Sequence, residues 1–178
     1  MAELKALAEK AQIPVANTLV GLGGFPGNHE LALGMVGMHG TVAANNCTED
    51  ADLVIAAGIR FHDRITGHPD FFCKKAKIIH IDIDPAEIDK NVTINVPIVG
   101  DLKRVLTELN ALVEPVTHET WIEQIREWQK EYPMVVPEST NGELHAQYVL
   151  SELNKIANDD AIIVTDVGQH QMWSAQFL

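Results

Sequence analysis

The fold is decided by a short apolar run, Asp52-Leu53-Val54-Ile55-Ala56-Ala57-Gly58. Its apolar side chains would occupy both faces of a strand, which is typical of a central strand in a parallel sheet. A second run, Lys77-Ile78-Ile79-His80-Ile81-Asp82-Ile83-Asp84, ends at Pro85, and a third spans residues 91–99. These three runs predict the strands of a buried parallel sheet.

Helical patterns alternate with these runs. Leucines and alanines at helical spacing predict a helix over residues 2–12, and residues 14–17 form a short strand candidate before a glycine-dense loop. Thr41 and Asp101 are expected to cap helices that end near residues 49 and 113. Residues 1–115 are therefore predicted to form an α/β domain, a Rossmann-like parallel sheet flanked by helices.

The pattern changes after Pro115. Trp121, Ile125 and Trp128 share one stripe of a predicted helix and are expected to be packing residues, so that residues 116–142 are assigned to a helix and a linker. Residues 143–157 predict a helix and residues 161–166 a strand. They would begin a second α/β unit over 143–178, which is expected to be truncated because one helix and one strand cannot close such a domain.

Composition limits the classes of function. The net charge of −12 argues against binding of nucleic acid, which depends on clustered lysines and arginines. No apolar stretch is long enough to cross a bilayer, and the N-terminal pattern has no signal core. The two cysteines lack metal-site spacing. We therefore expect a soluble cytoplasmic protein without nucleic-acid or membrane partners, with His29, His68, His118 and His145 at its surface.

Glycines at positions 34, 37 and 40 precede the helix that Thr41 is expected to cap. Glycine allows a backbone to approach a cofactor closely, and a helix N-terminus suits phosphate groups. The spacing is neither a GxGxxG fingerprint nor a Walker loop. Cofactor binding and a tight loop packed on the sheet both remain open.

Charged residues follow two of the predicted strands, where ligands of open α/β sheets bind. Arg60 and Arg64 are candidate partners for a pyrophosphate or a flavin, although they could instead pair with Asp63. Asp82 and Asp84 would point to the same face. We expect Asp82 to face a ligand hydroxyl and Asp84 to cap the turn that starts at Pro85.

Four segments together resemble the catalytic subunit of acetohydroxyacid (acetolactate) synthase, a thiamine-diphosphate enzyme family. They are Gly34-Met35-Val36-Gly37-Met38-His39-Gly40-Thr41, Gly58-Ile59-Arg60-Phe61-His62-Asp63-Arg64-Ile65-Thr66-Gly67, Ile78-Ile79-His80-Ile81-Asp82-Ile83-Asp84-Pro85 and Asp166-Val167-Gly168-Gln169-His170-Gln171-Met172-Trp173. The second and fourth are highly specific for that family. The resemblance implies the middle FAD-binding domain and the beginning of the thiamine-diphosphate domain.

The resemblance also implies site residues. Those for FAD are Thr18, Leu19, Val36, Gly37, Met38, His39, Gly58, Ile59, Arg60, Arg64, Ile65, Asp82, Ile83 and Asp101. Gln169 and His170 would touch the diphosphate of thiamine diphosphate. The family pattern usually has an aspartate where this sequence has His62, so His62 is left out. No catalytic or metal-binding residue is expected in this chain, because the ring-activating glutamate and the magnesium-binding segment lie elsewhere in the family.

Such enzymes condense two pyruvates, or pyruvate and 2-ketobutyrate, to acetohydroxyacids with loss of CO₂, in branched-chain amino-acid biosynthesis. The resemblance implies 2-ketoacid substrates, Mg²⁺, a homo-oligomer and a regulatory small subunit, while the chain alone should be inactive. Two alternatives remain open. One is another enzyme of the thiamine family, such as a glyoxylate carboligase or a pyruvate oxidase. The other is a stand-alone flavin- or nucleotide-binding module.

Overall fold

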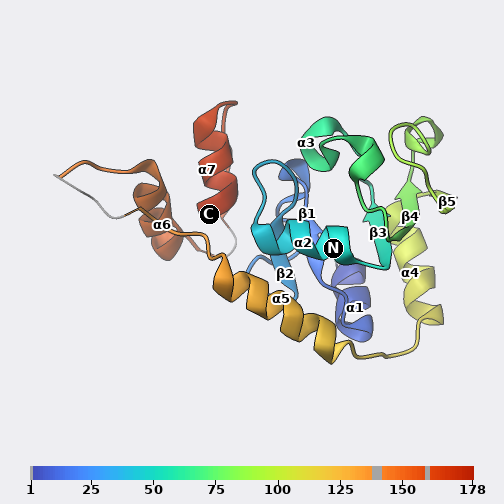
Figure 1. Ribbon diagram of the computed structural model, residues 1–178. Coiled ribbons are helices and arrows are strands. Elements are labelled where there is room, and N and C mark those ends of the chain that lie inside the picture. Colours follow the sequence, from blue (N-terminus) through green and yellow to red (C-terminus); the bar gives the residue numbers. More distant parts are fainter. Residues whose placement is uncertain (1, 138–141, 159–160) are drawn as a thin grey trace. The chain divides into compact units, whose positions relative to one another are not determined.

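The computed structural model describes residues 2–137, 142–158 and 161–178. The chain divides into two compact units, residues 1–132 and residues 133–178. The first unit is α/β, with parallel strands and flanking helices (Figure 1), which confirms the predicted fold class.

The main sheet of the first unit has three parallel strands in the order β3-β4-β5. These are β3 (Leu53–Ala57), β4 (Lys77–Asp82) and β5 (Val96–Val99). The position predicted for the first of them is wrong, because β4 is central and β3 pairs with β4 alone among the described residues. An apolar run indicates that the side chains on both faces of a strand are buried. It does not indicate whether the backbone of that strand is hydrogen-bonded to a neighbouring strand on each side.

A second pair of parallel strands joins β1 (Val15–Asn17) to β2 (Ala32–Met35). The 3₁₀ helix η1 (Leu19–Gly21) lies in the loop between them. The sequence predicted β1 but not β2. Val15 pairs with Ala32 and Ala16 pairs with Gly34, so Leu33 is an extra residue in β2, and Gly34 has a φ of +77°. A bulge with a positive-φ glycine breaks the alternation by which a strand is recognised in a sequence.

Helices α1 (Ala2–Ala11) and α4 (Leu102–Leu112) lie side by side, as Figure 1 shows. Lys10 Nζ donates to Asn110 O at 2.8 Å, and Asn110 Nδ2 donates to Glu3 O at 2.9 Å. Asp101 caps α4 by accepting from the backbone N–H of Arg104 at 3.0 Å. The two predicted helices and the predicted Asp101 cap are thus confirmed.

Helix α2 (Val42–Asp50) begins after Thr41, as predicted. Thr41 Oγ1 accepts from Ala44 N at 3.0 Å and donates to Leu33 O at 2.7 Å, so one hydroxyl caps α2 and ties it to the bulge of β2. Helix α5 (Glu119–Glu131) packs against α2. Trp121 and Trp128 meet edge to face, with centroids 5.7 Å apart, and pack on the core, which confirms them as packing residues.

Short helices complete the first unit. They are α3 (Asp63–Thr66), η2 (Pro69–Phe71) and η3 (Pro85–Glu87). Phe61 and Phe72 pack with Ile78 of β4 in a cluster beneath the segment between β3 and β4. This packing holds the segment in which the predicted arginines occur.

The second unit contains the helices α6 (Ala146–Ile156) and α7 (Gln169–Phe177). The helix predicted over 143–157 is confirmed, but the strand predicted over 161–166 is wrong, since residues 161–166 form no regular element. A strand needs hydrogen bonds from a neighbouring strand. The described residues of this unit offer none, and Ile162 and Val164 are 90% and 87% exposed. Residues 138–141 of the predicted linker lie outside the described part of the chain.

No helix in the described part of the chain is both long and apolar enough to span a membrane. His68 and His118 are exposed, as predicted, whereas His29 and His145 are partly buried. The His29 ring packs on Phe25, with the centroids 5.0 Å apart, and His29 Nε2 lies 3.1 Å from Glu9 Oε1.

Candidate functional site

A groove of about 410 Å³ lies where β3 and β4 end and α4 begins. It brings together five of the residues predicted for FAD: Gly58, Arg60, Asp82, Ile83 and Asp101. Ile81, Asp84, Glu87 and Leu102 also line it. The groove therefore lies at the carboxyl ends of the strands, where ligands of open α/β sheets bind.

Local hydrogen bonds shape the exit of β4. Asp82 Oδ1 accepts from Asp84 N at 2.8 Å, and Asp84 Oδ1 accepts from Ala86 N at 2.9 Å. Asp84 therefore caps η3, as predicted. The Asp82 side chain is 12% exposed, and the next side chain, Ile83, is 72% exposed at the groove. Asp82 keeps unused acceptor capacity, because a carboxylate group has about four lone-pair sites and the bond from Asp84 N occupies one.

The exit of β3 carries Arg60. Gly58 has a φ of +66° and donates its N–H to Ile81 O at 2.8 Å, while Arg60 O accepts from Asn91 Nδ2 at 3.3 Å. The alternative in which the arginines pair with Asp63 finds no support within the described residues, where neither guanidinium lies in an ion pair. Asp63 Oδ1 instead lies 4.0 Å from His62 Nδ1.

A second group of predicted residues meets where the glycine loop contacts α3. Met38 N donates to Arg64 O at 2.9 Å, and Arg64 Nη1 lies 3.8 Å from Met38 Sδ. Gly37 has a φ of +104°, and a Cβ added there would lie 2.4 Å from Arg64 O. Only glycine allows this approach without displacing the backbone.

Asn45 is a structural residue that sequence reasoning missed. Its Oδ1 accepts from Gly37 N at 2.8 Å, and its Nδ2 donates to Gly37 O at 3.0 Å. The one amide thus satisfies both backbone groups of the glycine. An asparagine at the fourth residue of a helix that begins beside a glycine loop was the available signal, because asparagine side chains often bond to nearby backbone.

The remaining residues predicted for FAD differ in exposure. Val36 and Ile65 are 9% exposed and belong to the core, so that a ligand could reach them mainly at the backbone. Met38 is 60% exposed, and His39 is exposed. Thr18 accepts from Gly21 N at 3.1 Å and so caps η1, which contains Leu19.

Gln169 and His170, predicted to touch thiamine diphosphate, lie in the second unit. Both are exposed in the first turn of α7, directly after Gly168. They follow an irregular segment, so the expectation that they come directly after a strand is wrong for the same reason as the strand itself.

The groove is strongly acidic. Among the described residues that line it, Arg60 is the one basic side chain, against the carboxyl groups of Asp82, Asp84, Glu87 and Asp101. Carboxylates accept hydrogen bonds and repel anions. The groove therefore suits the hydroxyl-bearing part of a nucleotide, whereas a diphosphate would favour the positions nearer the arginines.

Two other kinds of chemistry find little support in the described ranges. No group of three or more histidine, cysteine, aspartate or glutamate side chains could hold a metal ion within residues 2–137, 142–158 and 161–178. Burial raises the pKa of both Cys47 and Cys73 to about 12. Such thiols remain protonated near neutral pH and are poor nucleophiles.

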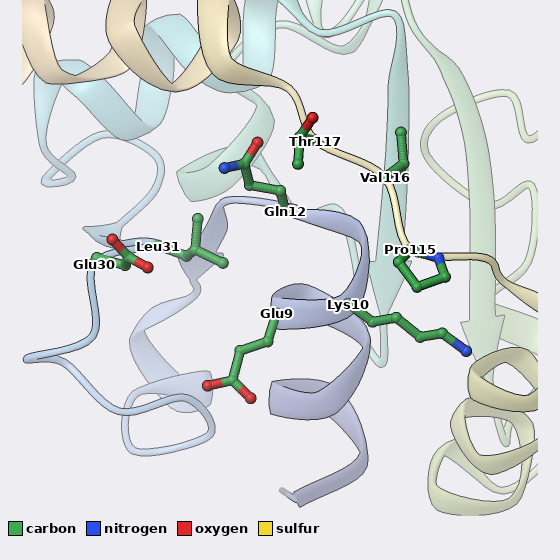
Figure 2. A pocket seen from close by; sticks show the side chains of 8 residues that line it. All are labelled: Glu9, Lys10, Gln12, Glu30, Leu31, Pro115, Val116 and Thr117. Atoms are coloured by element: carbon green, nitrogen blue, oxygen red, sulfur yellow. The ribbon is translucent and has the colours of Figure 1, made fainter.

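A larger cleft of about 660 Å³ lies between α1, the loop before β2 and the segment from α4 to α5 (Figure 2). Its polar groups join these segments. Val116 N donates to Lys10 O at 3.2 Å, and His118 N donates to Gln12 Oε1. The Lys10 ammonium is directed towards α4, where it bonds to Asn110 O at 2.8 Å. These groups are used in holding the fold together.

Comparison with known proteins gives consistent results. Residues 1–109 match the family described as thiamine pyrophosphate enzyme, central domain. An acetolactate synthase from Mycobacterium bovis is 49% identical over 99% of this chain, which spans 29% of that relative. A probable acetolactate synthase large subunit from Methanocaldococcus jannaschii is 49% identical over 98% of this chain and 31% of its own length. Acetolactate synthase 1, chloroplastic, from Zea mays is 44% identical over 98% of this chain and 28% of its length.

Proposed function

We propose a function from one premise, that the chain belongs to the thiamine pyrophosphate enzyme family and carries its central domain in residues 1–109. The chain spans 28–31% of the relatives named above. The proposed role is that of a part of an acetolactate synthase catalytic subunit, in which the first unit binds FAD. The alternatives of a glyoxylate carboligase or a pyruvate oxidase are not favoured, because the relatives that cover nearly all of this chain are named acetolactate synthases.

The observation that carries the FAD proposal is the groove at the ends of β3 and β4. It joins residues that are far apart in the sequence and that the resemblance had implied independently, among them Arg60, Asp82 and Asp101. An added Cβ at Gly58 would meet nothing within 4 Å, so this backbone is open to a ligand. These features fit a dinucleotide with hydroxyl groups at one end and a diphosphate near the arginines.

The proposed division of roles follows from charge. Asp82 and Asp101 accept hydrogen bonds from sugar or ribityl hydroxyls, and Arg60 and Arg64 face the diphosphate. Asp101 Oδ1 also caps α4, but a carboxylate has further acceptor sites to offer to a ligand. Met38 and His39 would contact FAD through the exposed surface of the glycine loop, and Gly37, which is buried, would contribute by its close approach to Arg64.

Thiamine diphosphate and Mg²⁺ belong to the whole enzyme in this proposal. When bound, thiamine diphosphate supplies the electron sink for joining two 2-ketoacids with loss of CO₂. Gln169 and His170 contribute to holding its diphosphate from the start of α7. Cytoplasmic localisation, a homo-oligomer and a regulatory small subunit complete the proposal. Acetolactate formation from pyruvate by the complete polypeptide, assayed with both cofactors added, tests the activity. The 178-residue chain alone should form none.

Titration of the chain with FAD, followed by flavin fluorescence, tests the binding role. Saturable binding is expected. An Arg60→Ala/Arg64→Ala variant should bind at least about tenfold more weakly, because each lost charge-assisted hydrogen bond contributes roughly 1.5 to 3 kcal/mol.

The matched control is Arg126→Ala/Lys130→Ala, which removes the same charge from α5. It should leave the affinity nearly unchanged. Equal weakening in both variants would show that net charge, and not the site, controls binding. Absence of binding by the folded parent chain would refute the FAD proposal for this unit.

A further inference from the structure

His80 is a fully buried titratable side chain with no role in the site described so far. It is 0% exposed and lies on β4 among apolar neighbours. Histidine is usually at least partly exposed, and burial of a polar ring is costly unless its nitrogens are hydrogen-bonded. Its one hydrogen bond among the described residues therefore indicates the role of the ring.

That bond is to the loop that follows β3. His80 Nε2 lies 2.9 Å from Ile59 O. A carbonyl oxygen can only accept, so Nε2 carries the proton that it donates to Ile59 O. Nδ1 has no hydrogen-bond partner within the described residues. Within the described residues, the one hydrogen bond of the ring is thus with the residue before Arg60.

The same ring also supports the next turn of the loop. The rings of Phe61 and His80 meet edge to face, with centroids 5.1 Å apart. Phe61 is 3% exposed and has a φ of +38°, which is unfavourable for a residue with a side chain. Such a conformation persists only when its surroundings hold it in place.

Four successive residues of this loop are consequently fixed from β4 and the segment beyond it. Gly58 N is bound by Ile81 O, Ile59 O by His80, and Arg60 O by Asn91 Nδ2. The Phe61 ring is held by packing. Because the backbone is held on both sides of Arg60, the position of its Cα at the rim of the groove is fixed.

His80 also lies next to the acidic side of the groove. Residues 80 and 82 share a face of β4, and His80 Nε2 lies 3.9 Å from Asp82 Oδ2. The paired residue on β3 is Ala56, whose small side chain leaves room on that face for the imidazole. The buried ring thus adjoins both the loop with Arg60 and the strand end with Asp82.

We propose that His80 is a positioning residue for the cofactor site, which holds the Gly58–Phe61 loop so that Arg60 faces the diphosphate. The inference rests on the proposed FAD function. It adds a residue that touches no ligand and that acts through Ile59 O and the ring of Phe61.

Two substitutions separate the hydrogen bond from the volume of the ring. His80→Gln keeps an amide donor at about the reach of Nε2, and it loses no bond at Nδ1, where none is made. His80→Leu keeps apolar volume but leaves Ile59 O without its donor. The leucine variant should bind FAD about tenfold more weakly, as expected for an unsatisfied buried acceptor, and the glutamine variant should recover most of the affinity.

A double-mutant cycle with Arg60→Ala tests whether His80 acts through Arg60. If it does, His80→Leu should have little further effect once Arg60 is absent. Independent, additive losses would overturn the proposal, as would unchanged affinity in His80→Leu. Failure of the glutamine to rescue binding in a well-folded variant would also overturn it.

Amide hydrogen exchange without FAD provides a measurement that does not depend on the proposed function. In His80→Leu, exchange should accelerate for the loop 58–62 and stay unchanged in α5. Equal protection of the loop in both proteins would overturn the inference even if FAD binds. Loss of protection in a chain that binds no FAD would support the positioning of the loop and refute the FAD proposal alone.

Discussion

Gly37→Ala tests how closely the glycine loop must approach α3. The added methyl would lie 2.4 Å from Arg64 O and 3.0 Å from Ile65 Cα. These are backbone atoms, so no side-chain rotation relieves the overlap. Arg64 O also accepts the N–H of Met38 at 2.9 Å, and the φ of +104° at Gly37 disfavours any residue with a Cβ. The backbone strain and the steric overlap should therefore both lower the free energy of unfolding.

The size of the effect follows from these two contributions. A positive φ costs a residue with a Cβ about 1 to 2 kcal/mol. Overpacking against atoms that cannot move freely costs about 1 to 3 kcal/mol. The free energy of unfolding of the first unit should fall by about 2 to 5 kcal/mol. FAD affinity should fall as well, because relief of the overlap moves Arg64.

Two other glycines provide controls that separate the contributions. Gly23 has a φ of +79° with nothing within 4 Å of an added Cβ, so that Gly23→Ala should show the conformational cost alone. Gly27 also has open space around an added Cβ, and its φ is one that residues with a side chain can adopt. Gly27→Ala should be neutral or slightly stabilising, since alanine reduces the entropy of the unfolded chain.

Urea unfolding followed by tryptophan fluorescence measures the series. A Trp173→Phe background confines the signal to Trp121 and Trp128, which both pack on the core of the first unit. The expected order of stability is Gly27→Ala, then Gly23→Ala, then Gly37→Ala. If Gly37→Ala proved no more destabilising than Gly23→Ala, the contact with Arg64 would not be a rigid constraint.

Three further predictions concern other described residues. Thr41→Val should destabilise the first unit by about 1 to 2 kcal/mol in urea unfolding, because it removes the cap of α2, and Thr41→Ser should restore most of it. Asp101→Asn should keep the stability of α4, since asparagine also caps helices, yet weaken FAD binding in the same titration; loss of both together would point to a structural role only. The pKa of the Cys47 and Cys73 thiols is about 12 when folded, against 9.0 ordinarily. Their contribution to stability is therefore complete below pH 9 and lost as the pH rises towards 12. Slow reaction with a thiol reagent at pH 8, accelerated by urea, would agree, and fast reaction of the folded chain would contradict it.

Much of the fold was predictable because it depends on local chemistry. The caps by Thr41, Asp84 and Asp101 need only a side-chain oxygen and backbone N–H groups two or three residues later. The helices are visible through apolar spacing, which repeats within a single segment. The resemblance implied the ligand-facing residues as separate groups, and no local rule could say which of them meet.

Errors arose where hydrogen bonds come from distant segments. The strand β2 was missed because the bulge at Leu33 and Gly34 interrupts its alternation. The strand predicted over 161–166 failed because apolar composition does not supply a neighbouring strand. The same limit explains why β3 was expected in the centre of the sheet.

The sequence by itself determined the family, the alternation of strands and helices, the capping residues and the chemical types available to the site. Only the tertiary structure decided that Arg60, Asp82 and Asp101 line one groove, that Asn45 binds both backbone groups of Gly37, and that His80 holds the loop before Arg60. The physical reason is separation along the chain. A hydrogen bond between residues 21 positions apart, such as that from His80 to Ile59, forms only after the parallel strands have brought their ends together.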